Sequence, residues 1–183
     1  MRNLATTHLL DDIARRFGEA CYEVPVGFKY VSAAMQEHNA VIGGESSGGL
    51  TVRGHIHGKD GIYAAALLVE MLSVTGKKLS ELVQELYDTF SARYMTEYDW
   101  AFDAEDKPRL QALLAGKELP VFPAKPTGVN DIDGRKILFE NGWLVARFSG
   151  TEPRLRVFCE MPDRKQAEAY SRIVADFLGL PME

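Results

Sequence analysis

The chain has 183 residues and a formal net charge of −5 at pH 7. Apolar residues make up 46% of it, which is enough to bury a core in one or two domains. An acidic chain without a basic cluster is a poor partner for nucleic acid or an anionic membrane. No apolar stretch approaches the roughly 20 residues that span a bilayer, and the first residues lack the apolar run of a signal peptide. Because Cys21 and Cys159 are too few for a disulfide framework, we expect a reduced, cytoplasmic protein.

The first third of the chain alternates between helix and strand patterns. Apolar periodicity and turn residues predict a helix over residues 6–18, a strand at 22–24, a helix over 28–37 and a strand at 40–42. Such alternation is typical of a parallel or mixed sheet with helices packed on it, so we expect an α/β domain. The glycine-rich segment 43–49 follows the last of these strands, at the sheet edge where open α/β sheets usually bind ligands.

Two further helices are predicted before a change of pattern near residue 92. Asp60 is placed to cap a helix over residues 61–74, which is apolar on nearly all sides and is therefore expected to be central and buried. An amphipathic helix over residues 80–90 follows it. We therefore predict two domains, residues 1–92 and residues 93–183.

The second domain is predicted to be a small α+β domain with an antiparallel sheet and helices on one face. The pattern predicts strands at 93–102, 136–140, 143–148 and 155–160, a short helix at 106–114, and a closing helix from Asp163. Asn141-Gly142 is a strong signal for a two-residue hairpin. Gln166 stands three residues after Asp163, where it would complete a capping box.

A polar turn between the last two strands has the composition of a phosphate site. It reads Arg147-Phe148-Ser149-Gly150-Thr151-Glu152-Pro153. Arginine offers a planar fork of donors to two oxygens, the hydroxyls of Ser149 and Thr151 add donors, and Gly150 lets a backbone N–H approach the ligand. The alternative is a hairpin turn with incidental polar residues.

This turn resembles the phosphate-binding loop of the α-D-phosphohexomutases, the family of phosphoglucomutases and phosphomannomutases. A second string, Gly43-Gly44-Glu45-Ser46-Ser47-Gly48-Gly49, resembles the sugar-binding loop of the same family. The order and spacing of the two strings match the third and fourth domains of that family, and the resemblance covers essentially the whole chain.

The resemblance implies that Glu45 and Ser47 bind neighbouring sugar hydroxyls, and that Lys29, in a Gly-x-Lys element, meets a phosphate or a ring hydroxyl. In an extended segment side chains two apart face the same way, so Glu45 and Ser47 could reach one pocket, and a carboxylate with a serine suits a vicinal diol. A polar surface loop and a solvated lysine are the alternatives. We expect this loop and the phosphate loop to face one common cavity.

Other polar residues do not build a metal site in the sequence. His55 and His57 alternate, but no third ligand stands near them. Asp131 and Asp133 precede a predicted strand and are better explained as turn residues. Glu152 is placed awkwardly for a phosphate site because its charge would repel the anion, and we expect it to face away from the ligand.

The resemblance also implies what lies outside this sequence. The family transfers phosphate between C1 and C6 of a hexose through a phosphoserine, a hexose 1,6-bisphosphate intermediate and Mg²⁺ held by three aspartates. Neither catalytic loop is found here, so the chain is expected to be a C-terminal fragment, inactive alone, with hexose phosphates and the missing N-terminal domains 1 and 2 as partners. The alternative function is a stand-alone, non-catalytic phosphosugar-binding or regulatory module.

Overall fold

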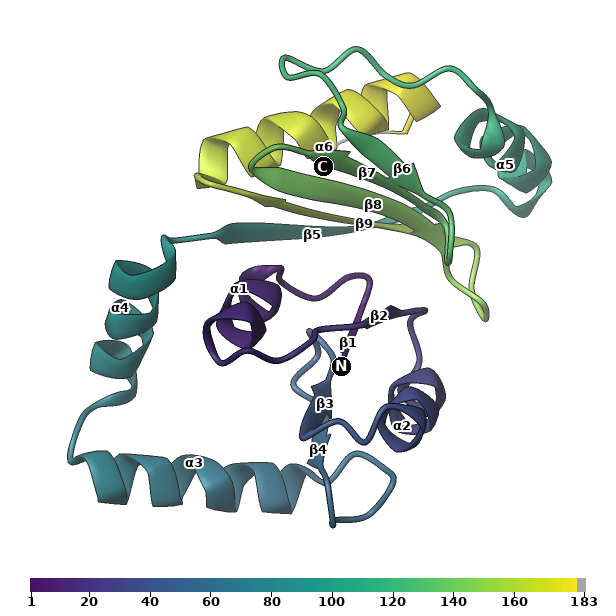
Figure 1. Cartoon of the computed structure of the whole chain (residues 1–183). Coiled ribbons are helices and arrows are strands. Elements are labelled where there is room, and N and C mark those ends of the chain that lie inside the picture. Colours follow the sequence, from purple (N-terminus) through teal and green to yellow (C-terminus); the bar gives the residue numbers. More distant parts are fainter. Residues whose placement is uncertain (181–183) are drawn as a thin grey trace. The chain divides into compact units, whose positions relative to one another are not determined.

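The structure, a computed structural model, describes residues 1–180 and divides into two compact units, Met1–Ala92 and Arg93–Glu183 (Figure 1). We call them unit 1 and unit 2 and describe each by itself. Among residues 1–180 no helix combines the length and the apolar character that crossing a bilayer requires.

Unit 1 contains a mixed four-stranded sheet with the strand order β2-β1-β3-β4. The strands are β1 (Arg2–Asn3), β2 (Glu23–Val24), β3 (Ile42–Gly44) and β4 (Leu50–Val52). β1 runs parallel to both neighbours, and β3 pairs antiparallel with β4. The predicted α/β class is confirmed. The strand expected at 40–42 begins only at Ile42. β4 was not predicted, because three residues that follow a glycine-rich segment show too little alternation to indicate a strand.

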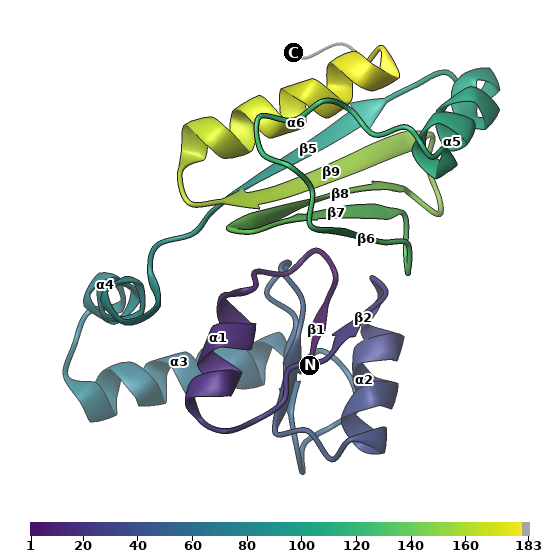
Figure 2. The same ribbon diagram turned by 45° about the horizontal axis from the view of Figure 1, so that its top comes forward.

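Two helices flank this sheet on opposite sides, α1 (Leu9–Arg16) and α2 (Phe28–Glu37) (Figures 1 and 2). α2 packs tightly on β3 because residue 43 is glycine. A Cβ at Gly43 would overlap Met35 Sδ and would lie 2.6 Å from Val31 Cγ1. The absence of a side chain therefore brings the helix down onto the strand that leads into the glycine-rich loop.

Arg2 ties α1 and β2 to the central strand β1. Its guanidinium is buried, with Nε and Nη2 at 2.7 and 3.0 Å from the Asp11 carboxylate and Nη1 donating to Glu23. A buried arginine is stable only when its charge is compensated. The two carboxylates supply that compensation and fix the start of the sheet.

The helix predicted at 61–74 forms, but its predicted burial is wrong. α3 (Gly61–Thr75) begins at the expected cap, where Asp60 Oδ1 accepts from the Tyr63 N–H at 2.9 Å. None of its residues is buried, and Ile62 and Val74 are at least 80% exposed. Hydropathy reports how apolar a helix is, whereas burial depends on which other elements cover it. α4 (Leu79–Phe90) follows and is equally unburied.

The sheet face on the side of α1 is open. A groove of about 460 Å³ lies between the apolar side of α1 and the start of β3. Leu10, Ile13 and Phe17 line it from the helix, and Val41 and Ile42 line it from the strand side. Unit 1 thus carries two apolar surfaces, on α1 with β3 and on α3, that residues 1–180 do not bury.

Unit 2 is a five-stranded antiparallel sheet with the order β5-β9-β8-β7-β6. Its strands are β5 (Tyr94–Ala101), β6 (Gly128–Asn130), β7 (Arg135–Phe139), β8 (Gly142–Phe148) and β9 (Arg154–Met161). The short helix α5 (Lys107–Ala115) follows a 3₁₀ turn, and α6 (Arg164–Leu178) closes the chain. Both helices cover one face of the sheet, as predicted, and β6 is the one strand of this sheet that was not expected (Figure 1).

The core of unit 2 lies between this sheet and α6. The inward side chains come from alternate strand positions and from one stripe of α6; they include Leu144, Leu155, Val157, Cys159, Ala167, Val174 and Leu178. Asp163 caps α6 by accepting from the Gln166 N–H at 2.9 Å. The predicted Asp163 cap and the apolar stripe of the closing helix are confirmed. The described residues show no return hydrogen bond from the Gln166 side chain, so the predicted capping box is not complete.

The hairpin between β7 and β8 forms where Asn141-Gly142 predicted it, but the turn is one residue earlier. Phe139 pairs with Gly142, so Glu140 and Asn141 make the turn and Gly142 is the first residue of β8. Gly142 has a packing role instead. A Cβ there would overlap the Glu160 carbonyl oxygen and lie 2.6 Å from Met161 Sδ.

We therefore expect Gly142→Ala to destabilise unit 2 by about 1–3 kcal/mol, the usual range for overpacking. Both tryptophans, Trp100 and Trp143, lie in unit 2, so urea unfolding followed by tryptophan fluorescence reports this unit. Gly150→Ala is the matched control, since a Cβ at Gly150 meets nothing within 4 Å. Equal unfolding midpoints for the two variants would contradict the packing role.

Candidate functional site

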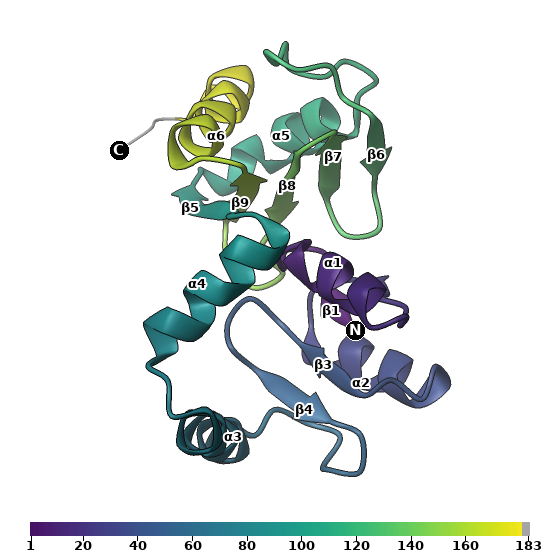
Figure 3. The same cartoon turned by 60° about the vertical axis from the view of Figure 1, so that its left-hand side comes forward.

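The glycine-rich loop is a tight turn that joins β3 to β4, not an extended segment. The Gly48 N–H donates to the Glu45 carbonyl at 3.0 Å, and the Glu45 N–H donates to the Gly49 carbonyl at 2.9 Å. Figure 3 shows the two strands side by side with this loop at their end. Side chains two apart face the same way only on extended backbone, so this turn does not place Glu45 and Ser47 on one side by alternation.

The Glu45 carboxylate is the centre of this loop and contacts three other segments. Its Oε1 lies 3.1 Å from both the Asn3 side-chain nitrogen and the Gly27 N–H, which donate to it. Its Oε2 lies 3.0 Å from Lys59 Nζ. The side chain is 6% exposed. A buried carboxylate is tolerated when it is paired and hydrogen-bonded, and Glu45 meets both conditions.

Asn3 and Thr6 continue this network into the β1–α1 connection. Asn3 Oδ1 accepts from the Ala5 N–H at 3.0 Å and from the Thr6 hydroxyl at 2.8 Å. Thr6 Oγ1 in turn accepts from the Ser46 N–H at 3.0 Å. The end of β1 and the glycine-rich loop after β3 are thus held together, as expected for neighbouring parallel strands whose carboxyl ends meet at one edge.

The Lys59 side chain packs against Gly49, and its ammonium group reaches Glu45. A Cβ at Gly49 would overlap Lys59 Cδ and lie 2.9 Å from Lys59 Cγ, so a side chain at position 49 would displace the lysine. The ammonium also lies 5.8 Å from the centre of the Phe28 ring, within range of a cation–π contact. The glycine at 49 therefore makes room for a protein cation.

These contacts set the charge state of Glu45. Burial alone would raise the pKa of the Glu45 carboxyl, but hydrogen bonds from Lys59, Asn3 and Gly27, with the Lys59 charge, together lower the pKa below its ordinary value of 4.5. Glu45 is therefore ionised at neutral pH. An ionised carboxylate accepts hydrogen bonds but does not donate them, which suits a ligand that offers hydroxyl groups.

Ser47 and Lys29 are placed differently from Glu45. Ser47 lies exposed in the turn, and residues 1–180 give its hydroxyl no hydrogen-bond partner. Lys29 is exposed and its Nζ lies 4.8 Å from the centre of the neighbouring Tyr30 ring. The lysine that contacts Glu45 is Lys59, while the Gly27-Phe28-Lys29 element contributes the Gly27 N–H. The ligand roles of Ser47 and Lys29 stay predictions.

In unit 2 the polar turn joins β8 to β9 as predicted. The Ser149 N–H donates to the Arg154 carbonyl at 2.8 Å and closes the turn. The Thr151 N–H donates to Ser149 Oγ at 3.4 Å, which leaves the Ser149 hydroxyl hydrogen free for another acceptor. Gly150 and Thr151 are exposed, and the space where a Gly150 side chain would stand is open.

Arg147, the first residue of the phosphate motif, is already paired with a carboxylate. Its Nε donates to Asp133 Oδ2 at 3.2 Å, and residues 1–180 give its two terminal amino groups no partner. Glu152 Oε2 lies 3.9 Å from Arg156 Nη2, and its expected orientation away from a bound anion stays a prediction. Asp133, which the sequence pattern assigned only to a turn, is thus in contact with the arginine of the phosphate motif.

The remaining polar residues form no metal centre within residues 1–180, where no group of three or more His, Cys, Asp or Glu side chains is placed to hold an ion. His55 Nε2 lies 2.9 Å from Asp60 Oδ2, and its ring stacks on Tyr63. His57 contributes its carbonyl to the Ser32 hydroxyl. The described residues therefore do not fit the magnesium ion that the family resemblance implies.

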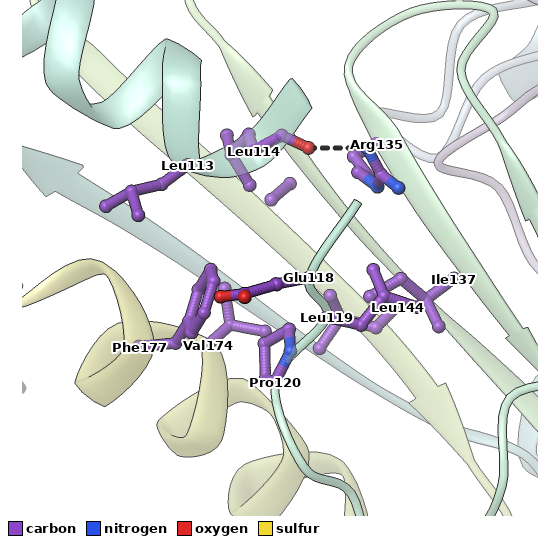
Figure 4. Close-up of a pocket in the computed structure, with 11 residues that line it drawn as sticks. Leu113, Leu114, Glu118, Leu119, Pro120, Arg135, Ile137, Leu144, Val174 and Phe177 are labelled. Atoms are coloured by element: carbon purple, nitrogen blue, oxygen red, sulfur yellow. Dashed lines mark hydrogen bonds between the residues drawn. The ribbon is translucent and has the colours of Figure 1, made fainter. Parts of the chain in front are cut away.

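Figure 4 shows a small pocket of unit 2 between α5, α6 and the sheet. This pocket is too small for a sugar. Its volume is about 10 Å³, roughly the space of one water molecule. Arg135 reaches its edge and donates to the Leu114 carbonyl at 2.8 Å. Cys159 is buried in the same core, and burial raises the pKa of its thiol to about 12, so it is unreactive at neutral pH.

Three residues around the Glu45 loop were missed by sequence reasoning: Asn3, Thr6 and Lys59. Asn3 carried a local signal, because an asparagine side chain often accepts a hydrogen bond from the backbone N–H two residues on, here that of Ala5. Lys59 carried none. It stands fourteen residues from Glu45, and only the β3–β4 hairpin brings the two together.

Two family profiles match the chain. The profile described as phosphoglucomutase/phosphomannomutase, alpha/beta/alpha domain III, matches residues 1–90, and the one described as phosphoglucomutase/phosphomannomutase, C-terminal domain, matches residues 101–177. A phosphoglucomutase/phosphomannomutase of Thermococcus kodakarensis is 36% identical over 91% of this chain and 35% of its own length. A protein of Methanosarcina acetivorans assigned as a phosphoglucosamine mutase is 34% identical over 87% of this chain and 34% of its own length.

Solved structures agree with these matches. The structure of a protein from Thermus thermophilus assigned as a phosphomannomutase aligns with a TM-score of 0.78 at 27% identity, over 97% of this chain and 36% of that chain. A more distant fold relative, the N-acetylphosphoglucosamine mutase of Aspergillus fumigatus in complex with GlcNAc-6P and magnesium, aligns with a TM-score of 0.56 at 16% identity, over 92% of this chain and 38% of that chain. The chain spans about a third of the length of the curated relatives it matches.

The lowered pKa of Glu45 predicts how stability depends on pH. A carboxyl whose pKa is lower in the folded than in the unfolded state stabilises the protein above the unfolded-state pKa, near 4.5, and this stabilisation is lost as pH falls through the lower folded-state pKa. We expect Glu45→Gln to lower the thermal unfolding midpoint at pH 7, and we expect its midpoint to approach that of the parent chain in strong acid, below the folded-state pKa of Glu45. An equal difference at both pH values, followed by circular dichroism, would contradict the ionised, paired state.

Proposed function

Since the chain belongs to the phosphoglucomutase/phosphomannomutase family and contains its domain III and C-terminal domain, we propose that it is the sugar- and phosphate-binding portion of a hexose-phosphate mutase. The whole enzyme would interconvert hexose 1-phosphate and hexose 6-phosphate through a phosphoserine and a hexose 1,6-bisphosphate. The serine loop and the magnesium loop would belong to polypeptide outside residues 1–183.

The observation that carries this proposal is the arginine at the end of β8. Asp133 holds one edge of its guanidinium, and the two terminal amino groups have no partner among residues 1–180. The Ser149 hydroxyl and the open backbone at Gly150 follow in the same turn. Charge-assisted hydrogen bonds to a phosphate contribute roughly 1.5–3 kcal/mol each. Arg147, Ser149, Gly150 and Thr151 would together hold the phosphate that is not reacting.

The Glu45 loop would hold the sugar. Its ionised carboxylate accepts hydrogen bonds from hydroxyl groups, and Ser47 adds an exposed hydroxyl two residues away. Lys59 already occupies one carboxylate oxygen, so a sugar would share that oxygen with the lysine or displace it. Binding energy from both loops would then orient the opposite end of the sugar toward the phosphoserine.

The two open apolar surfaces of unit 1 fit this role. The relatives are about three times as long as the part of them that this chain matches. We propose that their additional domains have counterparts that cover α3 and the groove beside α1 in the whole enzyme. A stand-alone binding module, the alternative function, would have to leave these surfaces in water, which is uncommon for large apolar patches.

The phosphate clamp predicts a specific loss of affinity. We expect Arg147→Ala to weaken the binding of glucose 6-phosphate to the chain by at least tenfold, since about 1.4 kcal/mol corresponds to a factor of ten. Isothermal titration calorimetry measures the dissociation constant. Arg164→Ala is the matched control, because Arg164 is an exposed arginine at the start of α6 in the same unit. Equal affinities in the two variants would remove the clamp.

Because the proposal places the serine loop and the magnesium loop outside residues 1–183, it predicts that the chain alone does not turn over substrate. With glucose 1-phosphate, Mg²⁺ and glucose 1,6-bisphosphate supplied, we expect no formation of glucose 6-phosphate above the background, because the residues that exchange the phosphoryl group are not in this sequence. A coupled assay with glucose-6-phosphate dehydrogenase measures the product. Turnover by purified chain that persists through repeated chromatography would contradict the proposal.

A further inference from the structure

The turn between β6 and β7 is packed directly against the arginine of the phosphate motif. Asp133 Oδ2 accepts from Arg147 Nε at 3.2 Å. The two residues are fourteen positions apart, and the antiparallel pairing of β7 with β8 brings them together, with Arg135 opposite Ala146. The turn that sequence analysis left without a function therefore delivers a carboxylate to the side of the proposed clamp.

Gly134 lets that turn approach so closely. Its φ of +84° lies in the left-handed region that favours glycine. A Cβ there would overlap the Ala146 carbonyl oxygen and would lie 2.6 Å from Arg147 Cβ. The backbone at 133–134 thus rests on the backbone at 146–147, and the position of Asp133 relative to Arg147 is fixed by main-chain packing instead of by two flexible side chains.

A second arginine explains why Arg147 needs such support. Arg156 on β9 stands directly opposite Arg147 on β8, so both side chains project from the same sheet face. Like charges at such a position repel each other. Asp99 compensates Arg156 on its far side, with Oδ2 3.5 Å from Nε, and Asp133 compensates Arg147. Asp99 also contacts Arg154 and Arg156 also contacts Glu152, whereas the contact of Arg147 is with Asp133.

We infer that Asp133 is a positioning residue, which holds the Arg147 guanidinium so that its two terminal amino groups bind a phosphate dianion end-on. This inference rests on the proposed function of Arg147. With Nε engaged, the fork formed by the two Nη groups is the edge left for a ligand, and that edge matches two phosphate oxygens. A ligand that finds the fork already oriented does not lose affinity to the ordering of a flexible arginine.

The inference predicts the opposite sign from simple electrostatics. Asp133 carries a negative charge close to the proposed phosphate, so by Coulomb's law alone its removal should tighten binding of an anion. If positioning dominates, its removal weakens binding instead. The sign of the change therefore separates a residue that orients Arg147 from one that only neutralises it.

The test is calorimetric titration of the full chain with glucose 6-phosphate. We expect Asp133→Ala to raise the dissociation constant at least tenfold and Asp133→Asn to raise it less, because the amide oxygen still accepts from Nε without the charge. In an Arg147→Ala background, Asp133→Ala should change the dissociation constant less than twofold, since the two residues act through one contact. Circular dichroism melts of each variant show whether it is folded. If Asp133→Ala does not fold, the isosteric Asp133→Asn still tests the inference.

Asp131→Ala is the matched control from the same turn. Its carboxylate is 62% exposed and lies 3.9 Å from Arg135, a different arginine, so its removal should leave the dissociation constant unchanged. Unchanged or tighter binding in folded Asp133→Ala and Asp133→Asn, with binding lost in Arg147→Ala, would overturn the positioning role and leave the clamp intact. If the parent chain and Arg147→Ala bind equally, or the parent chain does not bind, the clamp itself fails and the positioning role with it.

Discussion

The arrangement of the glycine-rich loop depends on the contacts of the Glu45 carboxylate. This carboxylate is nearly inaccessible to water, and it is stable there because an amide, a backbone N–H and an ammonium all point at it. These donors come from β1, from the start of α2 and from the segment after β4. Removal of the carboxylate would leave three donors without their acceptor, so one side chain connects most of the loops at this edge of the sheet.

The same principle of compensated charge applies to two arginines of unit 2. Arg147 and Arg156 stand opposite each other on neighbouring strands, and each is matched by a carboxylate on its outer side. A site that binds an anion must keep positive charge unsatisfied, and it must also be stable without the ligand. Pairing one edge of Arg147 with Asp133 meets both needs, because the terminal amino groups remain available while the charge is partly balanced.

The two units differ in how completely they bury their own apolar residues. Unit 2 has a continuous core between its sheet and α6, whereas unit 1 has a small core around Val31, Ala34 and Met35 and leaves α3 without a buried residue. A helix as apolar as α3 is normally covered. The curated relatives are about three times longer than the region of them that this chain matches.

Local sequence determined most of the helices and strands, though not β4 and β6, and the residue types of the two loops. Apolar periodicity, the caps at Asp60 and Asp163, and the hairpin near Asn141 act within a few residues, so each could be recognised without knowledge of the rest of the fold. Tertiary structure alone decided three other things: that Lys59 meets Glu45, that Asp133 meets Arg147, and that α3 is uncovered. The first two contacts join residues fourteen positions apart through strand pairing, and burial depends on neighbours that periodicity does not identify. Residue types reveal which chemistry is available, and the pairing of strands decides which of those groups touch.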